Sequence, residues 1–262
     1  MKRIRKVTYE KLNPDDKLLD YVECFWSVRN ESDKTEEFSI LPDGFFDIII
    51  TRTDGLPVKS FLYGLYTENF KCVVPGKTFM VAVSLKLPSL GSIIKREISD
   101  IVNGNIELQP DYFGIDFGSI KYLDLFSNIL SKNFIVSIKD EGDSRKIKLC
   151  RRIYASAGNL KISSTSKEIG WSAREINRFF NRNVGLSLKK YLKIIKFHDS
   201  FRSLKAKELN RPDLYYDQPH YIHETRKFSK TTPKKLSKNK NDRFIQLSVT
   251  SDEYTKDDEG NG

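Results

Sequence analysis

The sequence predicts an α+β protein, with a β-rich N-terminal part carrying trailing helices and an all-α C-terminal part. Three observations support this prediction. Short apolar, β-branched segments separated by polar turns fill the first ninety residues. From about residue 145 the apolar residues recur with helical spacing. The charge also changes sharply: residues 144–243 carry a net charge of about +18, against −4 before them and −4 after them.

The strands are predicted from composition and turn signals. "DYVECFWSV" (20–28), "EFSIL" (37–41), "FDIIIT" (46–51), "VKSFLYGLYT" (58–67) and "TFMVAVSLKL" (78–87) are rich in β-formers. "PDGF" and "DG" mark turns between them. Short strands at this spacing indicate a small barrel or sandwich.

Two helices are expected to follow the strands. In 89–104, Leu90, Ile93, Ile94, Ile98 and Ile101 would share one helical face, and 120–134 shows a similar pattern. The polar segment 140–146 suggests a boundary. We therefore expect domains at 1–140 and 145–237, with 238–262 as an acidic, disordered tail.

The C-terminal part is predicted to consist of short helices around one long helix. Helices are expected from 145 to Gly158, over 163–171, over 172–185, over 187–206 and over 218–229. Ser172 with Glu175 forms a capping-box signature, and Gly170 and Gly185 are stop signals.

The exposed face of 172–185 suggests base recognition. Ile176, Phe179 and Phe180 should point inward, which leaves Arg174, Asn177, Arg178 and Asn181 outside with Ala173. Arg can bond guanine O6 and N7, and Asn can bond adenine N6 and N7. Flanking lysines would hold phosphates: Lys161, Lys167, Lys189, Lys190 and Lys193. The alternatives are a solvated helix face and a basic surface that serves only solubility.

Two stretches resemble the AraC/XylS family of transcription regulators. "SSTSKEIGWSAREINRFFNRNVGLSLKKYLKIIKF" is similar to the family's first signature at Gly170, Ser172, Arg174, Ile176, Arg178, Phe180, Gly185, Ser187 and Tyr191. "YYDQPHYIHETRKFSKTTPKKL" is similar to its second signature. "YVECFWSV" and "ILPDGFFDIII" resemble, over a shorter length, a cupin-like domain that precedes such regions.

The resemblance implies two helix-turn-helix units joined by the helix 187–206, each placing one helix in a major groove. Arg174, Asn177 and Arg178 match the base-contacting positions of the first recognition helix. Gln218, Pro219, His220 and His223 match those of the second.

The second unit departs from the family pattern. Leu214 and Lys230 stand where glycine is usual, His223 where arginine is usual, and Thr225 where a core phenylalanine is usual. Pro212 interrupts the helix expected before it. The first unit is therefore expected to carry most of the base readout.

Other functions are disfavoured. His220 and His223 could face a metal ion, but no third ligand lies nearby in the sequence, so no metal site is expected. The first domain has no histidine for a cupin metal site, and no catalytic constellation or cofactor motif appears. Cys24, Cys72 and Cys150 form no CxxC pair. With no apolar run of membrane-spanning length, these features predict a cytoplasmic non-enzyme with no membrane partner.

The expected function is a sequence-specific regulator that binds double-stranded DNA. The first domain would sense a small-molecule effector or mediate homodimer formation. Its aromatic residues could line a ligand pocket or form core: Phe25, Trp26, Phe45, Phe46, Phe61, Tyr63 and Tyr66. The alternative is a ligand- or protein-interaction module that docks on DNA without sequence preference.

Overall fold

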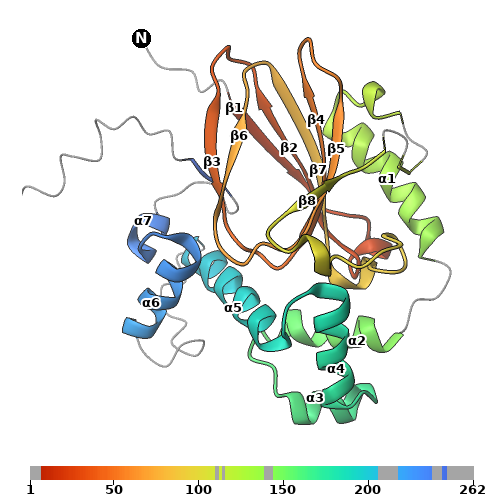
Figure 1. The fold of residues 1–262 in the computed structure, drawn as a ribbon, viewed down its shortest axis with the longest axis vertical. Coiled ribbons are helices and arrows are strands. Elements are labelled where there is room, and N and C mark those ends of the chain that lie inside the picture. The colour runs from red at the N-terminus through yellow and green to blue at the C-terminus, as the bar shows by residue number, and fades with distance from the viewer. Residues whose placement is uncertain are drawn as a thin grey trace, which may run out of the picture.

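The computed structural model describes residues 7–109, 112–113, 116–138, 144–205, 218–237 and 244–246. Antiparallel strands from the N-terminal part form the upper half of the molecule in Figure 1, and α2 to α7 lie below and beside them. The α+β class and the all-α C-terminal part are confirmed, and the β-rich first part agrees with a cupin-like domain.

Two antiparallel sheets make up the N-terminal part. The larger has the order β1-β2-β7-β4-β5-β8 and the smaller has the order β6-β3-β9. The larger sheet contains β1 (Val7–Leu12), β2 (Val22–Asn30), β4 (Phe46–Thr53), β5 (Lys59–Tyr63), β7 (Thr78–Leu85) and β8 (Asn105–Glu107). The smaller contains β3 (Glu36–Ile40), β6 (Phe70–Val74) and β9 (Phe244–Gln246). All five predicted strands are present, and β1, β6, β8 and β9 were not predicted.

Side-chain alternation gives the larger sheet two apolar faces. Trp26, Ile49 and Met80 point toward the smaller sheet and form one cluster with Phe38 and its neighbours. Phe25, Ile48 and Val81 point the other way, toward the helices, and belong to the main core. Both faces are buried, which explains why β7 and the first five residues of β4 are mostly apolar.

A short chain of hydrogen bonds satisfies polar groups inside the two-sheet cluster. Trp26 Nε1 donates to Ser84 Oγ at 3.1 Å, and Ser84 Oγ donates to Asp47 Oδ1 at 2.6 Å. These three groups lie deep between strands, so their pairing removes the penalty of burying unpaired polar atoms.

The helix predicted over 89–104 is wrong. This connector forms 3-10 turns at Leu87–Ser89 and Ser99–Ile101, and Gly91 between them has a left-handed backbone. Pro88 cannot donate to a helical ladder, and Gly91 reverses the chain so that Leu90 bridges to Ile94. The predicted apolar residues are nevertheless all buried, because the connector is enclosed between the sheet and the C-terminal helices.

The helices otherwise agree with the sequence pattern. The helix predicted over 120–134 is α1 (Leu123–Ser137), which begins three residues later. The remaining helices are α2 (Ser144–Ala155), α3 (Ile162–Ile169), α4 (Ala173–Phe179), α5 (Leu188–Lys205), α6 (Gln218–Ser229) and α7 (Pro233–Ser237). A π-helical turn, η5 (Phe180–Val184), follows α4. No helix in these described stretches is long and apolar enough to cross a membrane.

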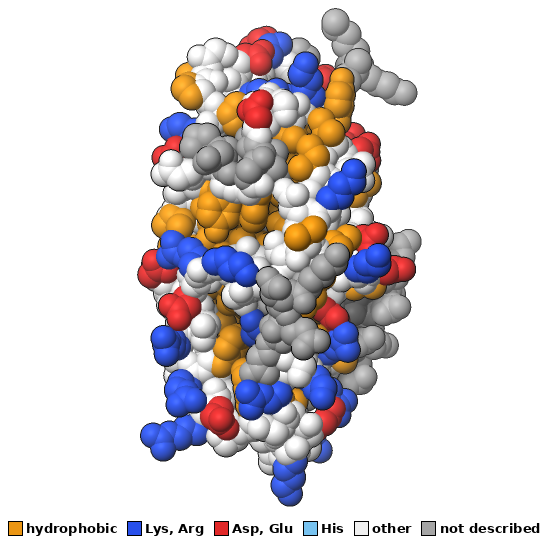
Figure 2. Space-filling model, turned by 90° about the vertical axis from the view of Figure 1, so that its right-hand side faces the viewer, with side chains coloured by type: hydrophobic (Ala, Val, Ile, Leu, Met, Phe, Trp, Pro, Cys, Tyr) orange, Lys and Arg blue, Asp and Glu red, His pale blue; other side chains and the backbone are white. Residues whose placement is uncertain are grey.

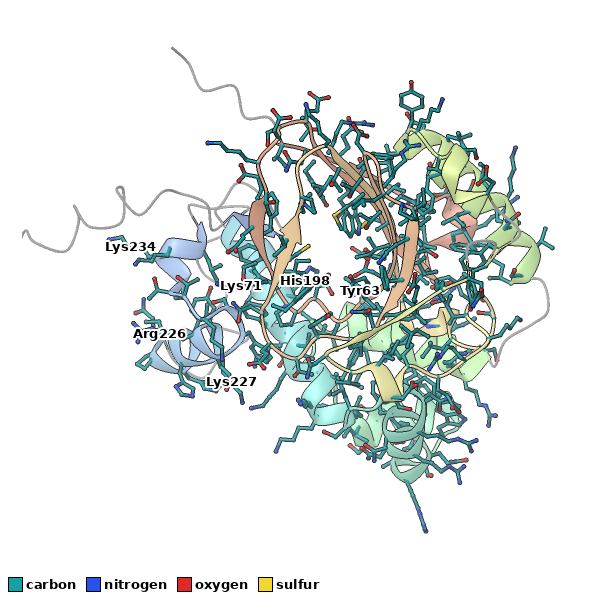
Figure 3. All side chains as sticks on the ribbon, turned by 45° about the horizontal axis from the view of Figure 1, so that its top comes forward. Tyr63, Lys71, His198, Arg226, Lys227 and Lys234 are labelled. Carbon is teal, nitrogen blue, oxygen red and sulfur yellow. The ribbon has the colours of Figure 1, made fainter. Side chains whose placement is uncertain are left out.

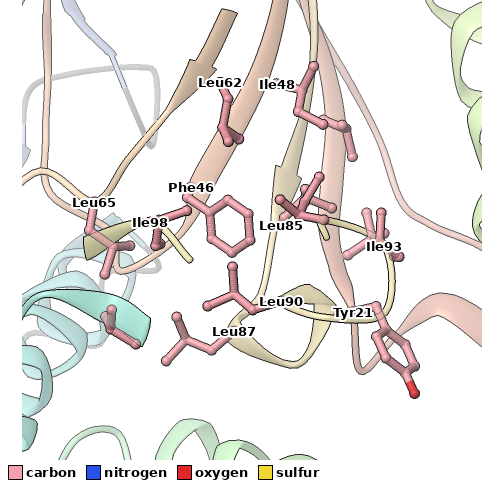
Figure 4. Close-up of a cluster of buried hydrophobic side chains, with 14 of the residues drawn as sticks. Tyr21, Phe46, Ile48, Leu62, Leu65, Leu85, Leu87, Leu90, Ile93 and Ile98 are labelled. Atoms are coloured by element: carbon pink, nitrogen blue, oxygen red, sulfur yellow. The ribbon is translucent and has the colours of Figure 1, made fainter. Parts of the chain in front are cut away.

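One continuous core joins the sheet to the C-terminal helices. Figure 4 shows Phe46, Leu65 and Leu85 from the sheet side meeting Leu87, Leu90 and Ile98 of the connector. Residues of α2, α4 and α5 belong to the same buried cluster. The helical part is therefore packed against the β-rich part rather than tethered loosely to it.

The aromatic residues of the first domain were expected either to line a ligand pocket or to form core, and the packing bears on this choice. Phe25, Trp26, Phe45 and Phe46 are buried core residues. Phe61, Tyr63 and Tyr66 are half-buried, and Tyr66 stacks on Phe70 with ring centroids 4.1 Å apart. Burial raises the pKa of Tyr63 to about 12, so its hydroxyl stays protonated.

Candidate DNA-binding surface

The first helix-turn-helix unit is built from α3 and α4. Gly170 closes α3 with φ +74° and donates its backbone N–H to Ser166 O. Ser172 then opens α4 through a capping box: Glu175 N–H donates to Ser172 Oγ, and Ser172 N–H donates to Glu175 Oε2. These bonds fix the turn, and they lower the pKa of Glu175 because the carboxylate accepts the Ser172 backbone N–H.

The inward face of α4 packs as predicted, with one exception. Ile176 and Phe180 are fully buried. Phe179 is only half-buried and lies against Trp171, with ring centroids 5.8 Å apart. The π-helical turn η5 begins at Phe180, so Asn181 is on η5 rather than on the straight helix.

The outward face carries the predicted polar side chains. Arg174, Arg178 and Asn181 are exposed, and Asn177 is half-buried. Asn177 Nδ2 donates to Ala173 O at 2.9 Å, and its amide oxygen takes no part in that bond. Within the described residues neither Arg174 nor Arg178 forms an ion pair, so their guanidinium donors are available to a ligand.

Lysines flank this face on neighbouring elements. Lys161, Lys167, Lys189 and Lys190 are all exposed, on or beside α3 and at the start of α5. Lys193 is also exposed, and its Nζ lies 3.6 Å from a carboxylate oxygen of Glu224, which joins α5 to α6. Figure 2 shows Lys and Arg side chains over the lower half of the molecule, which holds α2 to α4.

The end of this unit is docked on the connector of the β-rich part. Ile98 N–H donates to Asn183 O at 2.9 Å, and Arg182 lies 3.4 Å from Glu97. A Cβ added at Gly185 would lie 2.7 Å from the backbone of Ser99. The η5 turn that follows α4 therefore touches the N-terminal part directly.

The long helix α5 makes a second contact with the β-rich part. Tyr191 Oη donates to Gly44 O at 3.0 Å and lies 3.0 Å from Tyr154 Oη of α2. A Cβ at Gly44 would meet Ile195 Cδ1 at 2.4 Å, so the strand turn and the helix are in close contact. Burial raises the pKa values of Tyr154 and Tyr191 well above the usual tyrosine value.

The second unit is described only in part. Gln218, Pro219, His220 and His223 are exposed on α6. The helix expected before α6, with Pro212 and Leu214, lies outside the described residues. No three His, Cys, Asp or Glu side chains in the described part of the chain gather as metal ligands.

Two of the predicted departures have visible consequences in α6. Lys230 ends this helix with φ +56°, the left-handed conformation that glycine tolerates best. Thr225 is 1% exposed, and its hydroxyl has no hydrogen-bond partner among the described residues. Glu224 is also largely buried and is paired with Lys193.

Three further basic residues were not selected from the sequence. Arg226, Lys227 and Lys234 are exposed, and in Figure 3 they lie on α6 and α7, on the side away from the sheets. The sequence signal that could have selected them is their position in the basic block of residues 144–243. The α6–α7 end also contacts the β-rich part, since Asn69 N–H donates to Phe228 O at 3.0 Å.

Comparisons with known proteins give one family model and a few distant solved structures. Residues 10–107 match the family model described as a domain of unknown function, DUF6597. No curated protein matches the sequence. Among solved structures, ToxT from Vibrio cholerae is 11% identical, with 88% of this chain and 97% of that chain covered and a TM-score of 0.40.

A second ToxT structure, bound to (E)-4-(8-methylnaphthalen-1-yl)but-3-enoic acid, gives 12% identity, coverages of 88% and 97%, and a TM-score of 0.39. A structure of unsaturated fatty acid bound wild-type ToxT from Vibrio cholerae is 11% identical to this chain. The match covers 88% of this chain and 94% of that chain, with a TM-score of 0.39. Likenesses this low carry no functional argument. The chain resembles AraC/XylS regulators in its own signatures, and the function proposed below depends on its own residues.

Proposed function

We propose that this protein is a transcription regulator that binds double-stranded DNA in a sequence-specific manner, with α4 carrying most of the base readout. The observation that carries the proposal is the exposed Arg and Asn face of a capped helix that follows α3 through a tight glycine turn. This is the geometry in which the second helix of a helix-turn-helix enters the major groove.

The chemistry of the face suits base edges and phosphates separately. Arg174 and Arg178 can each donate two parallel hydrogen bonds to guanine, and Asn177 and Asn181 can bond adenine. Lys189 and Lys190 at the start of α5 are placed to hold phosphates, which contribute affinity but no sequence preference.

The second unit is proposed to add affinity and weaker readout. α5 has 18 residues, so it separates the two recognition helices by roughly 27 Å along its axis. Successive major-groove segments on one side of a duplex repeat about every 34 Å. His223 has at most two N–H donors where arginine has five, so it would bind phosphate more weakly, whereas Arg226 and Lys227 on the same helix add positive charge.

The N-terminal part is proposed to control how the helical part meets DNA, through an effector or through self-association. Support comes from its direct contacts with the recognition unit at Asn183, Arg182 and Gly185. A change in the connector would move the end of α4.

Selection of duplexes from a random pool by the full chain tests the proposal. Anisotropy titrations then compare the selected duplex with a shuffled duplex of the same length and salt concentration. A specific regulator should prefer the selected duplex by roughly a thousandfold or more. Equal affinity for both would favour the module that docks on DNA without sequence preference.

Two substitutions separate readout from phosphate binding. Arg178→Ala should reduce preference at one base-pair position by roughly 5- to 150-fold, because a bidentate contact contributes about 1–3 kcal/mol. Lys190→Ala should weaken binding to both duplexes alike and reduce the salt slope by about 1. Lys17→Ala, on the β-rich part, is the matched control. Identical effects of the first two would contradict the face assignment.

A further inference from the structure

A polar pocket lies on the β-rich part, away from the candidate DNA-binding surface. It has a volume of about 510 Å³ and is formed by β1, β2, β4 and β7 together with the segment that leads into α1. Its size is within the range of small-molecule sites. It is on the helix-facing side of the larger sheet, not between the two sheets, because Ser27 and Phe79 share that face with Phe25 and Val81.

Two arginines flank one aromatic ring at the base of this pocket. Arg29 on β2 and Arg52 on β4 are both paired in register with Phe79 on β7. Arg29 Cζ lies 4.3 Å from the centroid of the Phe79 ring, and Arg52 Cζ lies 6.0 Å from it. The strand register therefore holds one guanidinium group on each side of the Phe79 ring, and contact with that ring limits their freedom.

Each guanidinium is anchored through one donor only. Arg29 Nη2 donates to Lys121 O at 3.1 Å, and Arg52 Nη1 donates to Gly118 O at 3.2 Å. Among the described residues neither arginine is paired with a carboxylate. Since a guanidinium has five N–H donors, most of the donors on both side chains remain for a ligand.

Ser27 also lines this pocket. The residue as a whole is only 3% exposed, and its side chain hydrogen bonds to none of the described residues. Its hydroxyl is therefore free to bond an acceptor or donor on a bound molecule.

The start of α1 completes the pocket. Tyr122 occupies the N-cap position but makes no side-chain capping bond, so the first-turn N–H groups have no cap from it. Leu123 and Asp124 of this first turn line the pocket, and Lys121 precedes them. The positive end of a 15-residue helix therefore adds to the two arginines and the lysine.

We propose that this pocket binds a small organic oxyanion, through a carboxylate or phosphate group held by Arg29 and Arg52. Glu10 and Asp124 also line it, so three cationic and two anionic side chains surround the ligand. The excess of one positive charge suits a small anion better than a long polyanion, and Phe79 offers an apolar surface for its organic body. This site goes beyond the proposed DNA-binding function and does not depend on it.

Calorimetric titration of the full chain tests the proposal without DNA. Phenyl phosphate, inorganic phosphate and succinate are the probes, each against sodium chloride of equal ionic strength. Saturable binding of at least one probe at one site per chain is expected. Binding of the phosphates alone would assign a phosphate ligand, and binding of succinate alone would assign a carboxylate ligand. Absence of saturable binding by all three would overturn the proposal.

Variants place the binding at this pocket. Arg29→Lys and Arg52→Lys keep the charge but lose the bidentate fork, and each should weaken binding at least tenfold. Ser27→Ala, which disturbs packing least, should weaken it several-fold. Lys132→Gln, an exposed position on α1, should leave the affinity unchanged. Unfolding curves without probe show that each variant is folded, and unchanged affinity in all three pocket variants would refute the site.

Discussion

The close docking of the first helix-turn-helix unit on the connector predicts unequal effects of two similar substitutions. Gly170 and Gly185 both have left-handed backbones, with φ +74° and +78°, so alanine at either position introduces about 1–2 kcal/mol of backbone strain. A Cβ at Gly170 meets nothing within 4 Å. A Cβ at Gly185 would lie 2.7 Å from Ser99 Cα and O, and from Val102 Cγ2.

The difference between the two variants isolates the contact with the connector. Relieving a clash with fixed backbone costs about 1–3 kcal/mol. Gly185→Ala should therefore lower the free energy of unfolding by about 2–5 kcal/mol, and Gly170→Ala by about 1–2 kcal/mol. Alanine also reduces the entropy of the unfolded chain, and this stabilising effect is the same in both variants, so it cancels in the difference between them.

Urea denaturation followed by circular dichroism at 222 nm measures both values in the same protein. The wild-type slope should be retained in Gly170→Ala, so that midpoints convert to free energies. Equal losses in the two variants would show that Ser99 does not confine Gly185. That result would refute the inference that the recognition unit is rigidly docked on the β-rich part.

Four further outcomes follow from local geometry. Lys230→Gly should raise stability by about 0.5–1 kcal/mol in thermal unfolding, because the relief of left-handed backbone strain exceeds the added unfolded-chain entropy of glycine. A loss of stability would mean that the exposed ion pair between Lys230 and Glu68 contributes more than this strain costs. Thr225→Val should raise it by about 1 kcal/mol or more by removing an unpaired buried hydroxyl, with Thr231→Val as the half-buried control. Ser172→Ala should lower it by about 1 kcal/mol. Hydrogen bonds from Ser172 lower the pKa of Glu175, so the ionised carboxylate stabilises the fold fully above about pH 4.3, and this stabilisation is lost as pH falls through the lowered pKa. The stability difference between Ser172→Ala and the wild type should therefore become smaller in acid. Burial raises the pKa of Cys150 to about 12, so Ellman's reagent should label it only after unfolding. With the half-buried Cys72 replaced by serine, rapid labelling of the native chain would contradict this burial.

The sequence predicted best those features that short segments determine on their own. The capping box at Ser172 and the glycine stops at Gly170 and Gly185 depend on bonds within one turn, and the structure confirms all of them. Lys230, which stands where the resemblance places a glycine, has the left-handed backbone that glycine tolerates best.

Periodicity was misleading where the burial had another cause. The isoleucines of 89–104 are buried on all sides by two different layers, and this produces the same spacing as one face of a helix. Pro88 and Gly91 were the local signals against a helix. β1 was missed because the alternation of Val7, Thr8, Tyr9 and Glu10 is short and follows a basic start.

Features that depend on distant residues could not be predicted. The ion pair of Lys193 with Glu224 joins α5 to α6 and has no signal in the sequence. Arg29 and Arg52 have no relation in the sequence, and only the register of three strands brings them to one ring. Contacts between the connector and η5 depend in the same way on the packing of two separate parts.

The pairing of β9 with β3 gives the chain an unusual path. Ser39 pairs with Ile245, so the backbone returns to the first sheet system after leaving the helical region. The helical region is thus an insertion that is held at both ends by one host fold and cannot swing free on a single linker. A truncation before 244 would also turn β3 into an edge strand, and exposed edges promote association between chains. Affinity tags for this protein are therefore better placed at the N-terminus than fused closely behind β9.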